Sequence, residues 1–90
     1  MKKLSEYPNI GPAVEAQLHQ VGIDTMDQLQ DIGSQEAWLK IQSIDSSACI
    51  HRLYSLEAAI QGIKKKDLSL DDKQYLKDFY NQHKLSKNQD

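Results

Sequence analysis

The chain has 90 residues, a formal net charge of -2 and 39% hydrophobic residues. This length is enough for one domain with a single core and too short for two. Residues 1–62 hold four basic and eight acidic residues, and residues 63–90 hold seven and five, so neither part has the basic surface expected of a nucleic-acid-binding protein.

The first helical pattern begins after Gly11. We expect Gly11 to adopt backbone angles that residues with a Cβ avoid, and Pro12 to occupy the first turn of a helix. Apolar residues then recur at helical spacing on one face: Val14, Leu18 and Val21. Gly22 is predicted to end this helix in the usual manner of a C-terminal glycine.

A second helix is predicted directly afterwards. Asp24 and Thr25 are both good N-cap candidates, and Gly33 is expected to end the helix. Its apolar residues are Met26, Leu29 and Ile32. Two short helices joined at Gly22 form a pattern typical of a helix-hairpin-helix, a motif whose helix N-terminus attracts phosphate through free backbone N–H groups.

The charge of this hairpin argues against nucleic-acid binding. Residues 4–39 contain no lysine or arginine, and they contain six acidic residues: Glu6, Glu15, Asp24, Asp27, Asp31 and Glu36. Affinity for nucleic acid grows with the number of phosphates that Lys or Arg neutralise. A phosphate about 4 Å from Glu15 would be repelled by about 1 kcal/mol in water and about 4 kcal/mol at a surface dielectric. The pattern therefore favours contact with protein.

Three more helices are predicted beyond Gly33. Ser34 is expected to cap a short third helix, and Gly62 to end a fourth helix at the centre of the core. The fourth helix has the clearest apolar stripe, at Cys49, Leu53, Leu56 and Ile60. Ser69, followed by Asp72 three residues later, predicts the start of a fifth helix that carries Tyr75, Leu76, Phe79 and Tyr80.

The expected fold is therefore all-α, a compact five-helix domain with a helix-hairpin-helix-like N-terminal half. We expect residues 1–83 to form this single domain and residues 84–90 to be a polar, frayed tail. No apolar run approaches membrane-spanning length, and no export signal follows the first lysines. Cys49 is the only cysteine, so no internal disulfide can form, and a cytoplasmic location is the simplest setting.

The sequence offers no catalytic, cofactor or metal site. Cys49 and His51 are two residues apart on the predicted helix, so they point to different faces, and a buried structural cysteine is the better interpretation. His19, His51 and His83 lack metal-ligand spacing. The glycines stand singly at helix boundaries and form no phosphate loop. We expect no enzymatic activity.

Four aromatic residues are candidate contacts for a protein partner, which includes another copy of the chain: Trp38, Tyr54, Tyr75 and Tyr80. Beside Ala37 and Ile41, Trp38 is more often a core residue than a ligand-stacking one. An exposed apolar patch that contains any of the four would mark a partner site.

Weak, sequence-independent binding to a nucleic-acid backbone is the alternative. Its candidate phosphate contacts are Ile10, Gly11, Lys64, Lys65 and Lys66. Lysines just after a helix C-terminus are also accounted for by the helix dipole. The alternative gains support if the three lysines fold next to the turn at Gly11.

The order of these motifs resembles the C-terminal domain of the TfoX/Sxy family, regulators of natural competence in bacteria, here as a stand-alone domain. The resemblance spans about residues 4–70, and its segments are Pro8-Asn9-Ile10-Gly11-Pro12, Val21-Gly22-Ile23 with Thr25 and Leu29, Glu36-Ala37-Trp38-Leu39, and Leu53-Tyr54-Ser55-Leu56-Glu57-Ala58-Ala59-Ile60-Gln61-Gly62. It implies a compact five-helix domain without enzymatic activity that serves transcriptional regulation through other proteins.

Overall fold

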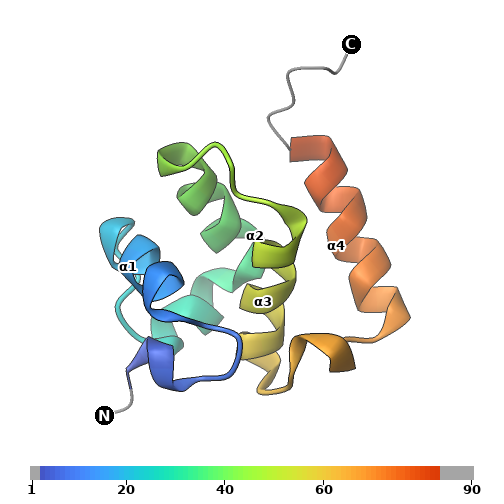
Figure 1. Cartoon of the computed structure of the whole chain (residues 1–90). Helices are drawn as coiled ribbons and strands as arrows, with labels where there is room; N and C mark the ends of the chain where they lie inside the picture. Colours follow the sequence, from blue (N-terminus) through green and yellow to red (C-terminus); the bar gives the residue numbers. More distant parts are fainter. Residues whose placement is uncertain (1–2, 84–90) are drawn as a thin grey trace.

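A computed structural model describes residues 3–83 of the chain. This part is all-helical and contains no strand (Figure 1). Its four α-helices and two short 3-10 helices follow the order η1 Leu4–Glu6, α1 Pro12–Gln20, α2 Met26–Ile44, α3 Ile50–Gln61, η2 Lys65–Asp67 and α4 Leu70–His83. The tail predicted at residues 84–90 lies outside the described residues, as do residues 1–2.

The prediction of five helices is wrong, because two of the expected helices form one element. Helix α2 continues through the expected boundary, with only Gly33 in a non-helical conformation, at φ 86° and ψ 161°. This combination of angles is essentially restricted to glycine. Gly33 therefore kinks the helix, and Ser34 resumes it without a connecting loop.

Local signals at the helix ends are confirmed at several positions. Thr25 caps α2 in a capping box with Gln28. Gly62 ends α3 in the left-handed conformation, at φ 76°. The Ser69 hydroxyl accepts a hydrogen bond from the Asp72 N–H at 3.0 Å.

Cys49 is the N-cap of α3, outside the helix, and it is half-buried where full burial was predicted.

The turn before α1 differs from the prediction. Gly11 has φ -90° and ψ 177°, an extended conformation that any residue can adopt. The left-handed residue is Asn9, with φ 74°, and asparagine is among the few non-glycine residues that tolerate this region. The chain therefore reverses at Asn9, two residues earlier than expected.

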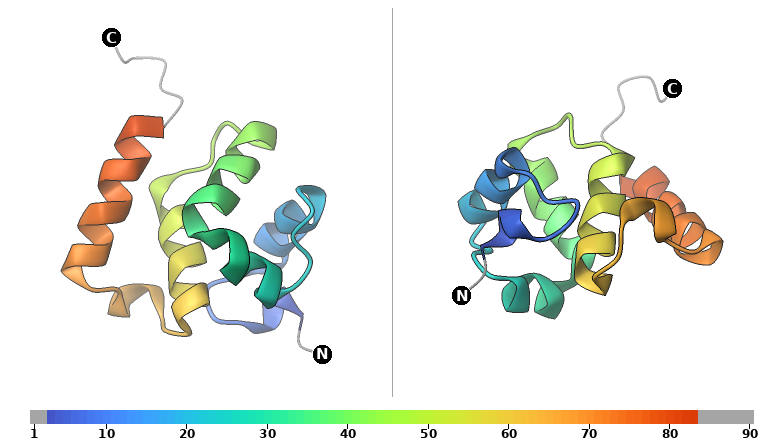
Figure 2. Two further views of the ribbon diagram at one scale, coloured as in Figure 1. Left: turned by 180° about the vertical axis from the view of Figure 1, so that it is seen from behind. Right: turned by 60° about the horizontal axis from the view of Figure 1, so that its bottom comes forward.

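Helix α3 lies between α2 and α4, as the prediction of a central helix requires (Figures 1 and 2). Leu53 and Leu56 on α3 are fully buried, and so is Trp38 on α2. The Trp38 indole Nε1–H donates to the Cys49 carbonyl at 3.2 Å. Burial of a large apolar side chain stabilises the folded state by about 1.5–3 kcal/mol relative to its exposure. The buried side chains of α3 and those around it therefore contribute much of the hydrophobic stabilisation.

The connection between α2 and α3 is fixed by Asp45. Its carboxylate accepts hydrogen bonds from the Ser47 hydroxyl and backbone N–H, from the Gln17 amide at 2.8 Å and from the Arg52 guanidinium at 3.0 Å. These hydrogen bonds, the one from the Ser47 hydroxyl first, hold the pKa of Asp45 well below its usual range. The ionised carboxylate therefore joins α1 and α3 at this turn.

Replacement of Gly33 by alanine is expected to lower the free energy of unfolding by about 1–3 kcal/mol, the cost of holding a non-glycine residue in this region. A Cβ at position 33 would meet no atom within 4 Å, so the loss would come from the backbone alone. Urea denaturation monitored by circular dichroism measures it.

Gly11→Ala is the matched control, because position 11 is equally open and has an ordinary negative φ. We expect it to change the unfolding free energy by less than about 1 kcal/mol, the scale of N-cap effects. Equal losses in the two variants would contradict the assigned kink.

A groove between helices α2 and α4

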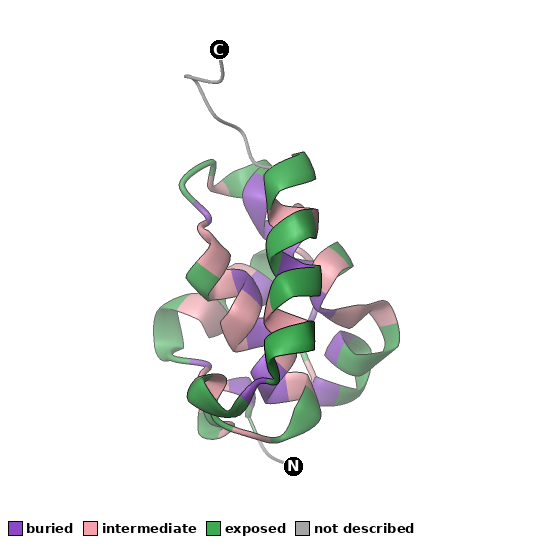
Figure 3. Cartoon of the chain, turned by 90° about the vertical axis from the view of Figure 1, so that its right-hand side faces the viewer, coloured by how far each residue is buried: buried purple, intermediate pink, exposed green. Residues whose placement is uncertain are grey.

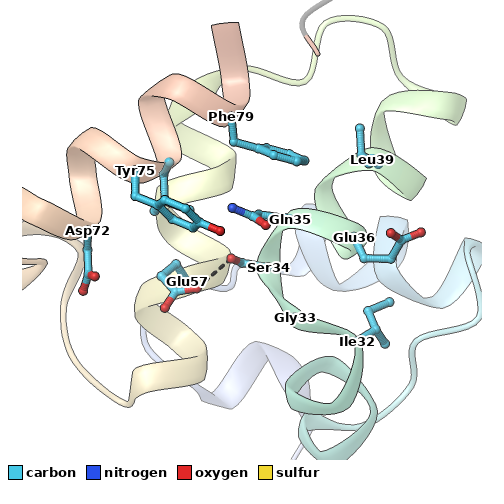
Figure 4. A pocket seen from close by; sticks show the side chains of 11 residues that line it. Ile32, Gly33, Ser34, Gln35, Glu36, Leu39, Glu57, Asp72, Tyr75 and Phe79 are labelled. Atoms are coloured by element: carbon cyan, nitrogen blue, oxygen red, sulfur yellow. Dashed lines mark hydrogen bonds between the residues drawn. The ribbon is translucent and has the colours of Figure 1, made fainter. Parts of the chain in front are cut away.

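A surface groove of about 440 Å³ lies where α4 faces the kink of α2 (Figure 4). Its lining residues come from α2, α3 and α4: Ile32, Gly33, Ser34, Gln35, Glu36, Leu39, Glu57, Asp72, Tyr75, Leu76 and Phe79. A second recess of about 310 Å³ continues it along α4 and adds Asp78 and Gln82. We call the two recesses together the α2–α4 groove.

The apolar part of the groove comes mainly from aromatic and aliphatic side chains on facing helices. Tyr75 and Phe79 project from α4 toward α2, and Leu39 lies on the opposite wall (Figure 4). Tyr75 is 65% exposed. An exposed aromatic ring in a recess is typical of interface anchors, since Tyr is enriched among residues that dominate binding energy.

The polar floor of the groove is a chain of hydrogen bonds. The Ser34 hydroxyl donates to one Glu57 carboxylate oxygen at 2.6 Å, and the Gln61 amide donates to the other at 2.6 Å. The same amide lies 3.1 Å from Asp72 Oδ2. Neutral donors thus hold two carboxylates in place and leave their negative charge uncompensated.

Helix α4 leaves one long face open to solvent. Exposed residues run along its outward side (Figure 3), and Leu76 is its one buried residue within the described part of the chain. Phe79 and Tyr80 pack on Trp38 with ring centroids 6.2 and 5.5 Å from the indole. The helix is therefore attached along one narrow strip, beside which the groove opens.

The four aromatic residues predicted as partner contacts differ in burial and in position. Trp38 is fully buried, which confirms the core interpretation, and Tyr80 is half-buried against it. Tyr54 is half-buried on α3, with its hydroxyl 3.4 Å from the Lys73 carbonyl. Tyr75 is the one of the four that lines the groove.

Several groove residues were absent from the predicted site. Phe79 was predicted only as a residue of the fifth helix, and Leu39 and Glu57 appeared only within the segments of the family resemblance. A signal for Phe79 was present, because positions 75 and 79 are four residues apart and lie on one face of a helix. The position of Glu57 opposite Ser34 depends on packing between α2 and α3, and no local signal predicts it.

The candidate phosphate contacts do come close together. Asn9 donates from Nδ2 to the Ile63 carbonyl at 2.8 Å, and its Oδ1 accepts from the Lys65 N–H at 3.1 Å. The segment Lys64–Lys66 therefore folds beside the turn that precedes α1. Ile10 is buried, and its N–H already donates to the Tyr7 carbonyl at 3.3 Å, so only part of the expected backbone site is open.

Two shifted pKa values occur on α1, outside the groove. Burial raises the pKa of Glu15, but the Ser5 hydrogen bond, His19 and Lys3 outweigh it, so the net pKa is lowered. The pKa of His19 is raised above 6.5, first by its hydrogen bond to Asp24, against an opposing effect of burial. The His19 Nδ1 lies 2.6 Å from Asp24, and Nε2 lies 3.8 Å from Glu15.

Two further properties concern the whole described range. Across residues 3–83, every helix is too short or too polar to cross a membrane. In the same range no three or more His, Cys, Asp and Glu side chains are grouped so that they could hold a metal ion.

Fold and groove together define a small all-helical domain with an aromatic, acidic surface groove. The family model of the TfoX C-terminal domain matches residues 1–80. The chain therefore belongs to the TfoX C-terminal domain family. No match is found among curated proteins.

Two crystal structures of Listeria monocytogenes proteins are similar to this chain. An uncharacterized protein in a triclinic form is 46% identical, with a TM-score of 0.89, over 90% of this chain and 92% of its own. A protein of unknown function in a tetragonal form is also 46% identical, with a TM-score of 0.84, over 87% and 96%.

The His19 pairing predicts a pH dependence. Because the folded pKa is raised, the stability that the pairing contributes is fully present below the unfolded pKa near 6.5 and is lost as pH rises through the folded pKa. An NMR titration of the His19 ring should give a midpoint above 6.5, and Asp24→Asn should lower it. Asp27→Asn, on an exposed carboxylate that forms no ion pair with His19, should leave it unchanged. An unchanged titration midpoint of His19 in the Asp24→Asn variant would disprove this pairing.

Proposed function

We propose that this domain is a non-enzymatic regulatory adaptor that binds a protein partner through the α2–α4 groove. The observation that carries the proposal is Tyr75, a largely exposed aromatic ring that lines both recesses of the groove. Exposure of such a ring costs hydrophobic free energy that a partner can recover by covering it.

The shape of the groove supports a macromolecular partner. The two recesses share Gln35, Tyr75 and Phe79, so they form one continuous groove along α4. Side chains from three helices converge there, and Phe79 is held against Trp38. Preorganised anchors of this kind reduce the entropy lost on binding.

The family supports a regulatory role. TfoX C-terminal domains are of regulatory type, and the family suggests a competence-related pathway. We infer that the domain acts there through another protein, with a helix-hairpin-helix-like N-terminal half that serves as scaffold. The proposal includes a cytosolic setting, consistent with the lone Cys49.

A site-specific cross-linking experiment tests this function. A photoreactive phenylalanine analogue at position 75, in cells of the source organism, is expected to give a discrete adduct with another protein. The same analogue at position 70 is the control, because Leu70 is 83% exposed on the same helix and does not line the groove. Adducts at neither position, or equal adducts at both, would count against the groove.

Tyr75→Ala should weaken binding of the cross-linked partner by about 2 kcal/mol or more, as expected for an interface hot spot. Its effect on unfolding should stay within about 0.5 kcal/mol, because the ring is mostly exposed. Leu70→Ala should leave affinity unchanged. Static light scattering on both variants shows whether self-association accompanies binding.

A second candidate function is weak binding to a nucleic-acid backbone. The observation that favours it is the pair of Asn9 hydrogen bonds, which hold Lys64–Lys66 beside the turn before α1. Glu15 opposes it, because its carboxylate lies on the first turns of α1, where it accepts from the Ser5 N–H at 3.3 Å.

This second function has a measurable salt signature. With at most three lysines engaged, the slope of log affinity against log salt should be no steeper than about -2.7. Fluorescence anisotropy with duplex DNA at low salt should show weak binding that Lys64→Gln, Lys65→Gln and Lys66→Gln together abolish. Lys40→Gln, Lys73→Gln and Lys77→Gln together form the charge-matched control, because they also remove three lysines of the described domain. No binding at low salt, or full binding by the triple variant, would remove this candidate.

A further inference from the structure

We propose that the occupant of the α2–α4 groove is a cationic segment of a partner protein, one large apolar side chain flanked by Lys or Arg. This inference rests on the proposed function and specifies the chemistry of its partner. It follows from the charges of the groove, the way they are held and the position of the exposed ring.

The charge of the groove has one sign. Its lining includes four carboxylates, on Glu36, Glu57, Asp72 and Asp78, and no Lys, Arg or His. The ion pairs within residues 3–83 lie elsewhere, between His19 and its two acidic neighbours and between Arg52 and Asp45. No lysine, arginine or histidine of the described domain therefore forms an ion pair with these four groups.

Two of these carboxylates are already oriented. Glu57 is held by Ser34 and Gln61, and Gln61 also reaches Asp72. Both acids are only partly exposed, so their field is screened less than that of a fully solvated charge. A cation that enters the groove would meet acceptors whose side-chain entropy has already been lost.

The apolar requirement comes from Tyr75, Phe79 and Leu39, which line the same recess as Glu36, Glu57 and Asp72. A purely cationic segment would leave these side chains exposed. A purely apolar segment would cover the carboxylates and remove their water without compensation, which is costly. One apolar anchor between basic residues satisfies both parts of the groove.

A second copy of the chain is the competing occupant. Lys64–Lys66 followed by the 83% exposed Leu70 has a similar chemistry. In this segment, however, Leu70 is flanked by Ser69 and Asp71, and not by cations. The backbone of Ile63 and Lys65 is also held by Asn9 within the fold. We therefore assign the groove to a different protein.

The test is selection from a phage library of random dodecapeptides against the immobilised full chain. We expect the selected peptides to combine Lys or Arg with a large apolar residue. For synthetic peptides, a chain with Glu36→Gln, Glu57→Gln and Asp72→Asn should lose affinity by about tenfold or more, with the larger loss at low salt. Circular dichroism checks that the variant is folded.

The control chain carries Glu6→Gln, Asp27→Asn and Asp31→Asn, three exposed acids outside the groove, so it loses as many charges as the groove variant. It should bind the peptides as the unmodified chain does. Equal losses in the control and groove variants would mean that only net charge matters, and this would overturn the inference.

The remaining outcomes separate the inference from the proposed function. Neutral or acidic peptides that lose affinity with Tyr75→Ala would keep the groove as a protein-binding site and overturn its cationic specificity. Cationic peptides that are insensitive to Tyr75→Ala, or no selected peptide at all, would count against the groove itself. Concentration-dependent growth in light scattering, abolished by Lys64→Gln, Lys65→Gln and Lys66→Gln together, would assign the groove to a second copy and overturn the inference.

Discussion

The packing of Trp38 connects three of the four helices within residues 3–83. Its indole is fully buried in α2, donates to the Cys49 carbonyl at the start of α3 and contacts the rings of Phe79 and Tyr80 on α4. Edge-on aromatic pairs contribute about 0.5–1.5 kcal/mol beyond the area they bury. Helix α4 also packs along α3, where Leu76 is its buried residue, and the indole fixes its position relative to α2. The groove exists only while α4 keeps that position.

The opposite wall depends on Gly33. A straight helix would carry the residues after position 33 in the same direction as those before it, and the wall formed by Ile32, Ser34 and Leu39 would not face α4 in the same way. The kink uses backbone angles that cost about 1–3 kcal/mol for other residues. Glycine occupies the position although a Cβ would meet no neighbour, so the requirement is conformational. One residue thus interrupts the helix and shapes the candidate site.

The sequence predicted the features that are encoded locally. The cap at Thr25, the left-handed glycine at position 62 and the serine at position 69 were read correctly, because each acts on backbone groups a few residues away. Gly33 was misread, since a glycine at a kink and a glycine at a helix end look alike in one sequence. Asn9 was missed as a structural residue because its partners are 54 and 56 positions away. Exposure of Tyr75 with partial burial of Tyr80 likewise follows from how α4 docks, which periodicity alone does not determine.

The two charged regions of the domain explain why protein is the favoured partner. The segment Lys64–Lys66 lies beside the turn that could receive phosphate, but Ile10 uses its N–H internally and Glu15 places a carboxylate on the same helix end. At the turn before α1, a phosphate would therefore find fewer free N–H donors and less positive charge. In the groove, by contrast, the acids and the aromatic rings favour the same ligand, because a basic residue beside an apolar anchor satisfies both. Affinity requires that every buried group of an interface finds a partner. By that criterion the groove is the more complete binding surface.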